Sequence, residues 1–94
     1  MLFEWSPEKA EANLRKHKIG FDSASRALLG LTVTKSSVRL GETRFMSTCV
    51  VDGRKIVVIW TPRQNAVRLI SARVARVHER REFDQALREA AETR

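Results

Sequence analysis

The sequence is poor in the side chains that most often carry proton transfer, metal binding or disulfide formation. Its 94 residues include no tyrosine, one cysteine and two histidines. No phenol can therefore act as an acid or a base. The single cysteine, Cys49, cannot form an internal disulfide, which favours a reducing compartment. Because Cys49 lies in an apolar run, we expect a small buried side chain rather than a nucleophile.

Missing motifs exclude further classes of protein. The sequence has no His-x-His pair, no pair of cysteines and no tight carboxylate cluster with ligand spacing, so we expect no metal site. Glycine-rich phosphate-binding loops are also missing, and we expect no cofactor. No apolar run approaches the length of a membrane span, and Met1–Trp5 lacks the features of a signal peptide. We therefore expect a cytoplasmic protein with no membrane partner.

Acidic residues are scarce in the middle of the chain. The formal net charge is +7, and residues 26 to 81 hold twelve Lys and Arg against only Glu42, Asp52 and Glu79. A basic middle with nearly neutral flanks indicates an anionic partner, either a nucleic acid or an acidic protein. The alternative is a solvated basic surface that serves only solubility.

The patterning that is present predicts one α+β domain over residues 1–94, with the order β-α-α-β-β-β-β-α. We expect helices over Pro7–His17, Phe21–Leu28 and about Val74–Glu92, and strands over Phe3–Trp5, Leu31–Thr34, Phe45–Val51, Lys55–Thr61 and Val67–Ala72. The last four strands should form an antiparallel four-stranded meander with helices on one face. The other face, or the groove beside the last helix, remains for function.

Short motifs mark the ends of these elements. Ser6 followed by Pro7 predicts a helix start, because a hydroxyl can cap the helix and proline suits its first position. Asp52-Gly53 is a strong hairpin signal, since both residues tolerate positive φ. We expect a polar connection at Gly41–Arg44 and a turn at Pro62–Ala66.

The last expected strand is punctuated by arginines. Strict alternation places Val67, Leu69, Ser71 and Arg73 on one face and Arg68, Ile70 and Ala72 on the other. Arg63 lies in the turn before this strand. Each of Arg63, Arg68 and Arg73 can bind phosphate in a two-pronged contact. The alternative is a surface ion pair worth ~0–1 kcal/mol, but we expect the local acids to be too few to pair all three.

These residue types suit the cleavage of RNA without a metal. That reaction needs a base for the ribose 2′-hydroxyl, an acid for the leaving oxygen and cations for the extra phosphate charge. Arginine can supply only the cation. His17 and Glu42 are both candidates for the base. For His17 the alternative is a histidine that only satisfies a helix end, and we expect His78 to be solvated.

Four motifs carry a resemblance to a known family. The first comprises Phe3–Lys9, Asn13–His17 and Phe21, and the second is Gly41–Phe45. The third runs from Asp52–Arg54 to Trp60-Thr61, and the fourth comprises Arg68–Arg73 and Glu79–Arg81. In these motifs the chain resembles, over nearly its full length, the BrnT family of toxins, the ribonuclease partners of bacterial type II toxin–antitoxin modules. The resemblance implies a RelE-like fold and metal-independent endoribonuclease activity that inhibits translation.

The resemblance also implies partners and functional positions. It implies neutralisation by a ribbon-helix-helix antitoxin of the BrnA type, in a complex with two copies of each protein that binds operator DNA. The positions carried over are Lys16, His17, Glu42, Arg44, Arg63, Arg73 and Arg80. We assign catalysis to His17, Glu42, Arg63 and Arg73. The expected RNA-binding residues are Lys16, Arg44, Arg54, Trp60, Arg68, Arg76, Arg80 and Arg81.

Some residues depart from the family pattern. Lys18 stands where the family often has glycine, so a left-handed helix end there is strained. Trp60 and Phe83 replace tyrosines that are common in the family. The alternative function is therefore a domain of the same fold that binds RNA or a protein partner without cutting. A DNA-binding repressor is a weaker alternative, because no helix-turn-helix is evident.

Overall fold

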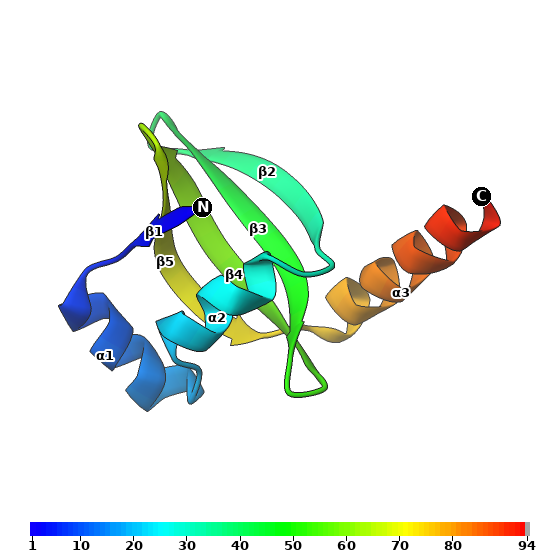
Figure 1. Cartoon of the computed structure of the whole chain (residues 1–94), viewed down its shortest axis with the longest axis horizontal. Coiled ribbons are helices and arrows are strands. Elements are labelled where there is room, and N and C mark those ends of the chain that lie inside the picture. The colour runs from blue at the N-terminus through cyan, green and yellow to red at the C-terminus, as the bar shows by residue number, and fades with distance from the viewer. Residues whose placement is uncertain (94) are drawn as a thin grey trace.

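The computed structural model describes residues 1–93 and has an α+β fold. Its elements are β1 (Leu2–Glu4), α1 (Pro7–His17), α2 (Phe21–Leu28), β2 (Val33–Arg39), β3 (Glu42–Val51), β4 (Arg54–Arg63), β5 (Ala66–Val74) and α3 (Val77–Glu92). The predicted order of elements is confirmed. Figure 1 shows α1 and α2 together at one side of a twisted sheet, with α3 projecting away from it.

The sheet has five strands in the order β1-β5-β4-β3-β2. The predicted antiparallel meander is formed by β2 to β5. The fifth strand, β1, lies at the edge and pairs in parallel with β5, from Leu2 opposite Ala66 to Glu4 opposite Arg68. Because β1 is only three residues long, it leaves the rest of the outer edge of β5 uncovered.

The first helix begins and ends as its sequence predicts. The Ser6 hydroxyl accepts a hydrogen bond from the Lys9 amide at 3.4 Å, and Pro7 occupies the first turn. At the other end Lys18 adopts the left-handed conformation, with φ 60° and ψ 31°, and its amide donates to the Leu14 carbonyl. Lys18 thus bears the strain that glycine would avoid.

Two hairpin turns set the ends of β2, β3 and β4, and the sequence predicted only one of them. Asp52 and Gly53 both have positive φ, 49° and 78°, which confirms the predicted turn. The predicted connection at Gly41–Arg44 is wrong, because a second two-residue turn of the same kind forms at Leu40-Gly41, with φ 52° and 76°. This tight turn allows β2 to continue to Arg39 and β3 to begin at Glu42.

Two other boundaries differ from the prediction. The last helix begins at Val77 rather than Val74, because Val74 still pairs with Ile56 in the sheet. The turn between β4 and β5 is shorter than predicted, since Arg63 pairs with Ala66. In both places the strands are longer than predicted, and the adjoining helix or turn is shorter.

The core lies between the sheet and the two N-terminal helices. Its buried side chains are Ile19, Phe21, Ala24, Cys49, Ile56, Val58, Leu69 and Ala72. Trp5 closes one side by meeting Phe21 edge to face, with ring centroids 5.9 Å apart. Cys49 is fully buried, as predicted, and burial raises the pKa of its thiol to about 11.

A bulge in β5 overturns the predicted alternation. Ser71 stands opposite Ile59 while Leu69 stands opposite Trp60, so Ile70 is an extra residue. Leu69 and Ala72 consequently both enter the core. Ser71 and Arg73 lie on the opposite side of the sheet, which we call the open face because α1 and α2 do not cover it.

The buried Asn13 anchors α1 to the uncovered edge of β5. Its amide nitrogen donates to the Ala72 carbonyl at 3.0 Å, and its amide oxygen accepts from the Ala72 amide at 3.1 Å. The same amide nitrogen donates to the Ile19 carbonyl at 3.1 Å. The Asn13 side chain therefore replaces a neighbouring strand and holds the C-terminal half of α1 against β5.

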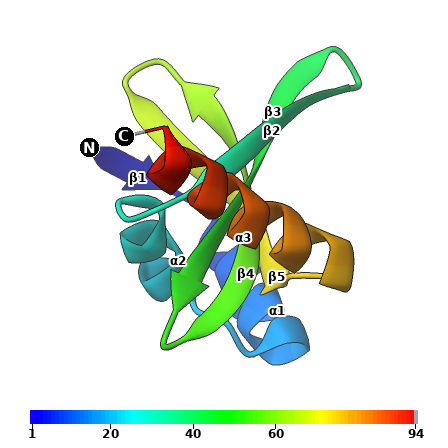
Figure 2. The same cartoon turned by 90° about the vertical axis from the view of Figure 1, so that its right-hand side faces the viewer.

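The third helix packs on the open face, so the expectation that all helices share one face is wrong. Figure 2 shows α3 crossing in front of the sheet, on the side away from α2. Only its first turns are held closely, with Glu79 and Phe83 buried. No helix within residues 1–93 is long and apolar enough to cross a membrane.

Candidate nucleic-acid interface

One end of the open face gathers a carboxylate and several arginines. Glu42 begins β3, Arg63 ends β4, and Arg39 stands opposite Glu42 at the end of β2. Arg44 Nε lies 3.3 Å from Glu42 Oε1, and Arg63 Nη2 lies 3.5 Å from Glu42 Oε2. We call Arg39, Glu42, Arg44 and Arg63 the Glu42 cluster. It joins an accessible proton acceptor to cations suited to phosphate.

A third ion pair extends this basic end across the sheet. Arg68 stands opposite Thr61 on β4, and its Nη1 lies 3.0 Å from Glu4 Oε2 on β1. The buried Thr61 hydroxyl donates to the Thr43 carbonyl at 2.8 Å, which fixes the strand ends beneath the cluster. Arginines thus occur on four adjacent strands of one face.

Arg73 and Glu79 form a two-pronged charged contact at the other end of the open face. Two parallel hydrogen bonds of 2.8 Å join them, and their side chains are only 18% and 11% exposed. The Arg76 amide also donates to Glu79, at 2.7 Å. Chiefly through the Arg73 hydrogen bonds, the pKa of Glu79 falls to about 2, and that of Arg73 is raised in turn.

This pairing engages the side chain of Arg73, which was predicted to be catalytic. Both prongs of its guanidinium are occupied by Glu79, so Arg73 does not offer a free two-pronged phosphate contact. Its contacts instead join the end of β5 to the first turn of α3. The side chain thereby helps to position α3.

The expectation that local acids are too few to pair the arginines is also wrong. Arg63 meets Glu42, Arg68 meets Glu4 and Arg73 meets Glu79. Further acids come from α3, where Glu82 pairs with Lys35 and Asp84 pairs with Lys55. The partners Glu4, Glu82 and Asp84 lie outside the basic stretch of sequence and reach it only through the fold.

The four residues predicted to be catalytic do not meet in one place. Glu42 and Arg63 lie together, whereas Arg73 pairs with Val57, six residues along β4 from Arg63. At about 3.3 Å per residue, this separation is roughly 20 Å. His17 and Lys16 lie elsewhere, in a shallow depression between α1 and Ile70-Ser71 of β5. His17 is therefore not adjacent to the Glu42 cluster.

Trp60 does not lie on the open face. Its ring stacks on Phe45 with centroids 4.6 Å apart and packs against the core. Its indole N–H donates to the Ser47 hydroxyl at 2.9 Å. A base-stacking role therefore finds no support in this position.

The remaining predicted RNA-binding residues fall into two groups. Arg76, Arg80 and Arg81 are exposed around the first turns of α3, where Arg80 also donates to the Ala75 carbonyl at 3.0 Å. Arg54 is exposed in the hairpin between β3 and β4. The first group lies around the start of α3, whereas Arg54 begins β4 and pairs with Val51 next to the hairpin turn.

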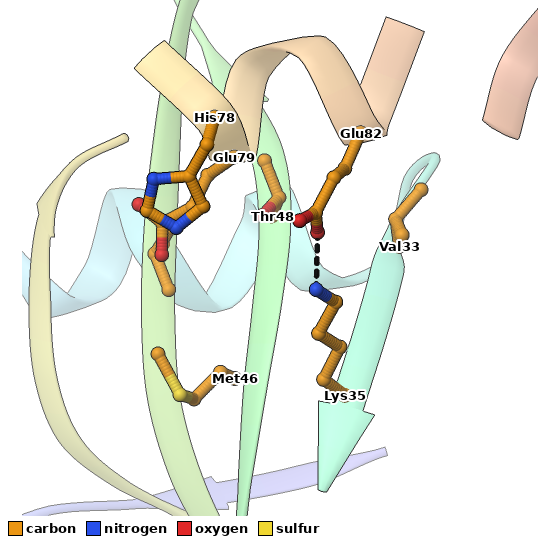
Figure 3. Close-up of a pocket in the computed structure, with 8 residues that line it drawn as sticks. Val33, Lys35, Met46, Thr48, His78, Glu79 and Glu82 are labelled. Carbon is orange, nitrogen blue, oxygen red and sulfur yellow. Dashed lines mark ion pairs between the residues drawn. The ribbon is translucent and has the colours of Figure 1, made fainter. Parts of the chain in front are cut away.

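A cavity lies between α3 and the open face, where the sequence predicted a groove beside the last helix. It holds about 120 Å³ and is lined by Val33, Lys35, Met46, Thr48, Val57, His78, Glu79 and Glu82. Figure 3 shows Lys35 reaching from β2 towards Glu82 on α3, with His78 and Met46 beside the same space. Alternation along β3 places Met46 and Thr48 on the open face.

Metal ligands do not gather in this part of the molecule. Within residues 1–93, no three histidine, cysteine, aspartate or glutamate side chains are placed to hold a metal ion. The Glu42 carboxylate has arginines as neighbours.

The fold and the interface define a class of small basic α+β proteins that present arginines, with the Glu42 carboxylate among them, on a single sheet face. Residues 5–79 match the family model for the ribonuclease toxin BrnT of type II toxin–antitoxin systems, and the chain belongs to this family. The match includes the Glu42 cluster and extends to Glu79. Membership of this family makes the protein an RNA-cleaving toxin with an antitoxin partner. A search of curated proteins found no match.

Proposed function

We propose that this ribonuclease toxin cleaves RNA at the Glu42 cluster and needs no metal ion. The observation that carries the proposal is the position of the Glu42 carboxylate between Arg44 and Arg63. Glu42 takes the proton of a ribose 2′-hydroxyl, and that oxygen attacks the adjacent phosphorus. The bond from phosphorus to the 5′-oxygen breaks, and water returns a proton to the leaving oxygen. The products are a 2′,3′-cyclic phosphate and a 5′-hydroxyl.

The arginines act on the phosphate in this proposal. Arg44 and Arg63 donate hydrogen bonds to its non-bridging oxygens, where negative charge accumulates in the transition state. Their contacts with Glu42 are single and long, 3.3 and 3.5 Å. For the exposed Arg63 such a pair contributes only ~0–1 kcal/mol, and Arg44 is only partly buried. A phosphate can therefore share or replace them, unlike the two short bonds that hold Arg73.

Glu42 is a better candidate for the base than His17 because of its neighbours. Proton removal is useful only where cations can bind the phosphate that is attacked. Glu42 has Arg44 and Arg63 within 3.5 Å. His17 shares its depression with Lys9 and Lys16, and none of the predicted catalytic arginines lines it.

The RNA strand is proposed to run from the Glu42 cluster along the open face towards α3. Arg68 flanks the cluster on β5. At the opposite end, Arg76, Arg80 and Arg81 are exposed around the start of α3. Contacts of this kind bind the phosphate backbone, so the affinity should fall steeply as salt is raised.

Cleavage by purified protein variants tests this site. Glu42→Gln removes the base but keeps the size of the side chain, and it should slow cleavage by ~10²–10⁴-fold, with the wild-type rate unchanged by EDTA. Glu11→Gln is the matched control, because Glu11 forms an exposed ion pair with Arg15 on α1. Wild-type rates in Glu42→Gln, with loss of cleavage in His17→Ala, would move the base to His17. RNA binding without cleavage by the wild type would favour the alternative of a binding module.

We further propose that the toxin acts in the cytoplasm, inhibits translation and is neutralised by a BrnA-like ribbon-helix-helix antitoxin. Membership of the family supports an antitoxin partner. Two copies of each protein are proposed to form a complex that binds operator DNA. Expression of this chain alone should arrest growth and degrade RNA, and co-expression of a ribbon-helix-helix protein encoded beside it should restore growth. Normal growth with intact RNA would contradict the proposal.

A further inference from the structure

The cavity between α3 and the open face is large enough to receive part or all of one small ring system. Its volume is about 120 Å³, well above the ~10–15 Å³ that holds a single water molecule. One wall is the sheet, where Val33, Met46 and Val57 supply apolar surface. The other wall is the first two turns of α3, where the exposed imidazole of His78 borders the space (Figure 3).

These walls suit a nucleobase. The flat rings of a base are stabilised by aliphatic side chains on one face and an aromatic ring on the other. The Met46 thioether is flexible and adapts to such a surface. His78 takes no part in the proposed cleavage chemistry, and its exposed ring lines this cavity.

A donor and an acceptor stand side by side at the edge of the cavity. The Lys35 ammonium and the Glu82 carboxylate form an ion pair there, with side chains 63% and 42% exposed. An exposed pair of this kind is weak, so a ligand can take over its hydrogen bonds. Thr48 adds a hydroxyl that can donate or accept.

We propose that this cavity binds an unpaired guanine of the RNA. Guanine presents the O6 acceptor beside two adjacent donors, N1–H and N2–H. The two oxygens of the Glu82 carboxylate can accept both donors while Lys35 donates to O6. Adenine, cytosine and uracil each set a ring acceptor or a carbonyl beside a single donor. The carboxylate would then face a lone pair, which leaves a polar group unpaired.

The location links the base to the scissile phosphate. Met46 lines the cavity, and Arg44 is the next residue of β3 on the open face. Two residues of a strand span about 7 Å, so a base held in the cavity belongs to a nucleotide next to the Glu42 cluster. The inference rests on the proposed RNA cleavage and identifies the base that the site selects.

Binding of uncleavable oligonucleotides tests the cavity separately from the chemistry. Fluorescence anisotropy is measured with 2′-fluoro pentanucleotides, which lack the attacking hydroxyl and carry one guanine, hypoxanthine or adenine among uracils. The wild type should prefer guanine over adenine by about 5- to 150-fold, the range expected of one two-pronged base contact. Hypoxanthine, which lacks the N2 amino group, should fall between them.

Two matched variants on α3 identify the residue responsible. Glu82→Gln should abolish the preference for guanine over hypoxanthine. Asp84→Asn breaks the comparable ion pair to Lys55, at 3.1 Å, but Asp84 does not line the cavity, so the preference should persist. Equal affinity for the three oligonucleotides in the wild type, or the same preference in Glu82→Gln, would overturn the proposal.

A second measurement does not depend on either variant. Addition of guanosine monophosphate should shift the NMR methyl signals of Val33 and Val57, and unchanged signals would contradict the site. Because neither measurement involves cleavage, the outcomes remain distinguishable. Selective guanine binding with normal cleavage in Glu42→Gln would reject the catalytic proposal alone. Loss of cleavage in Glu42→Gln without base preference would reject only the cavity.

Discussion

Arg73 on β5 and Glu79 on α3 are joined by two parallel hydrogen bonds of 2.8 Å each. The Arg76 amide between them in sequence also donates to Glu79, so the carboxylate closes the connection from the last strand to the last helix. The pair sits on the open face, where α3 forms one wall of the cavity. Stability of this contact therefore governs the geometry of the cavity as well.

The Arg73–Glu79 contact predicts a specific loss of stability in acid. Because the pKa of folded Glu79 is about 2, against an ordinary value of 4.5, its contribution is complete above pH about 4.5. It is lost as the pH falls towards 2, and amounts to about 3 kcal/mol. Glu79→Gln should lower the free energy of unfolding by about this amount at pH 7 and very little at pH 2. Urea unfolding across this range measures both effects.

An exposed pair provides the control for that experiment. Glu11 and Arg15 are 73% and 68% exposed, so Glu11→Gln should change the free energy of unfolding by at most ~1 kcal/mol. If Glu79→Gln kept the acid-dependent slope of the wild type between pH 4.5 and 2, the assignment of that slope to Glu79 would be refuted.

Asn13 should be among the least replaceable polar residues. Asn13→Ala leaves the backbone groups of Ala72 and the carbonyl of Ile19 without their partners. Each unsatisfied buried group costs ~1–3 kcal/mol, so we expect a loss of several kcal/mol in urea unfolding. The same substitution at the exposed Asn65, in the turn before β5, should cost ~0.5 kcal/mol or less. Similar losses at the two sites would contradict the anchoring role.

Lys18→Gly should stabilise the protein. Lys18 has φ 60°, a conformation that costs a residue with a Cβ ~1–2 kcal/mol. The gain is reduced by loss of the hydrogen bond from Lys18 Nζ to the Arg15 carbonyl, which leaves about 1 kcal/mol. For a domain of this size, that gain raises the melting temperature by roughly 4–8 °C. A calorimetric scan that shows a lower melting temperature would refute the strain argument.

Arg63→Ala should impair cleavage more than folding. Arg63 is an exposed cation with one long contact to Glu42, so its removal should hardly change the melting temperature. Loss of a group that stabilises transition-state charge typically costs ~10²–10³-fold in rate. Arg15→Ala is the control for loss of one positive charge, since Arg15 lies on α1. If both variants reduced cleavage equally and only slightly, Arg63 would act through the overall positive charge of the protein and not at the transition state.

Cys49 should resist alkylation in the native protein. Its thiol is fully buried, and its pKa of about 11 leaves little thiolate at pH 8. Mass spectrometry should detect no reaction with iodoacetamide over hours in buffer, and complete reaction in concentrated urea. Rapid native labelling would show that the core beneath α2 opens readily.

Local signals in the sequence were sufficient for the fold class and for most of the elements. Ser6 and Pro7 mark the start of α1, and Asp52-Gly53 marks the central hairpin, because capping and positive φ depend on neighbouring residues alone. The exposed Leu40 did not suggest a turn, yet it takes positive φ beside Gly41. Only pairing of β2 with β3 over seven residues made that conformation favourable.

The sequence by itself determined the composition of the site: many fixed cations, few acids, and the motifs of the BrnT family. Tertiary structure decided which of these residues meet. The bulge at Ile70 reversed the side-chain direction along β5, and α3 brought Glu79, Glu82 and Asp84 onto the open face. Ion pairs between distant segments depend on strand register and helix packing, which no local pattern encodes. For that reason Glu42 lies in contact with arginines of the Glu42 cluster, whereas His17 and Arg73 lie away from that cluster.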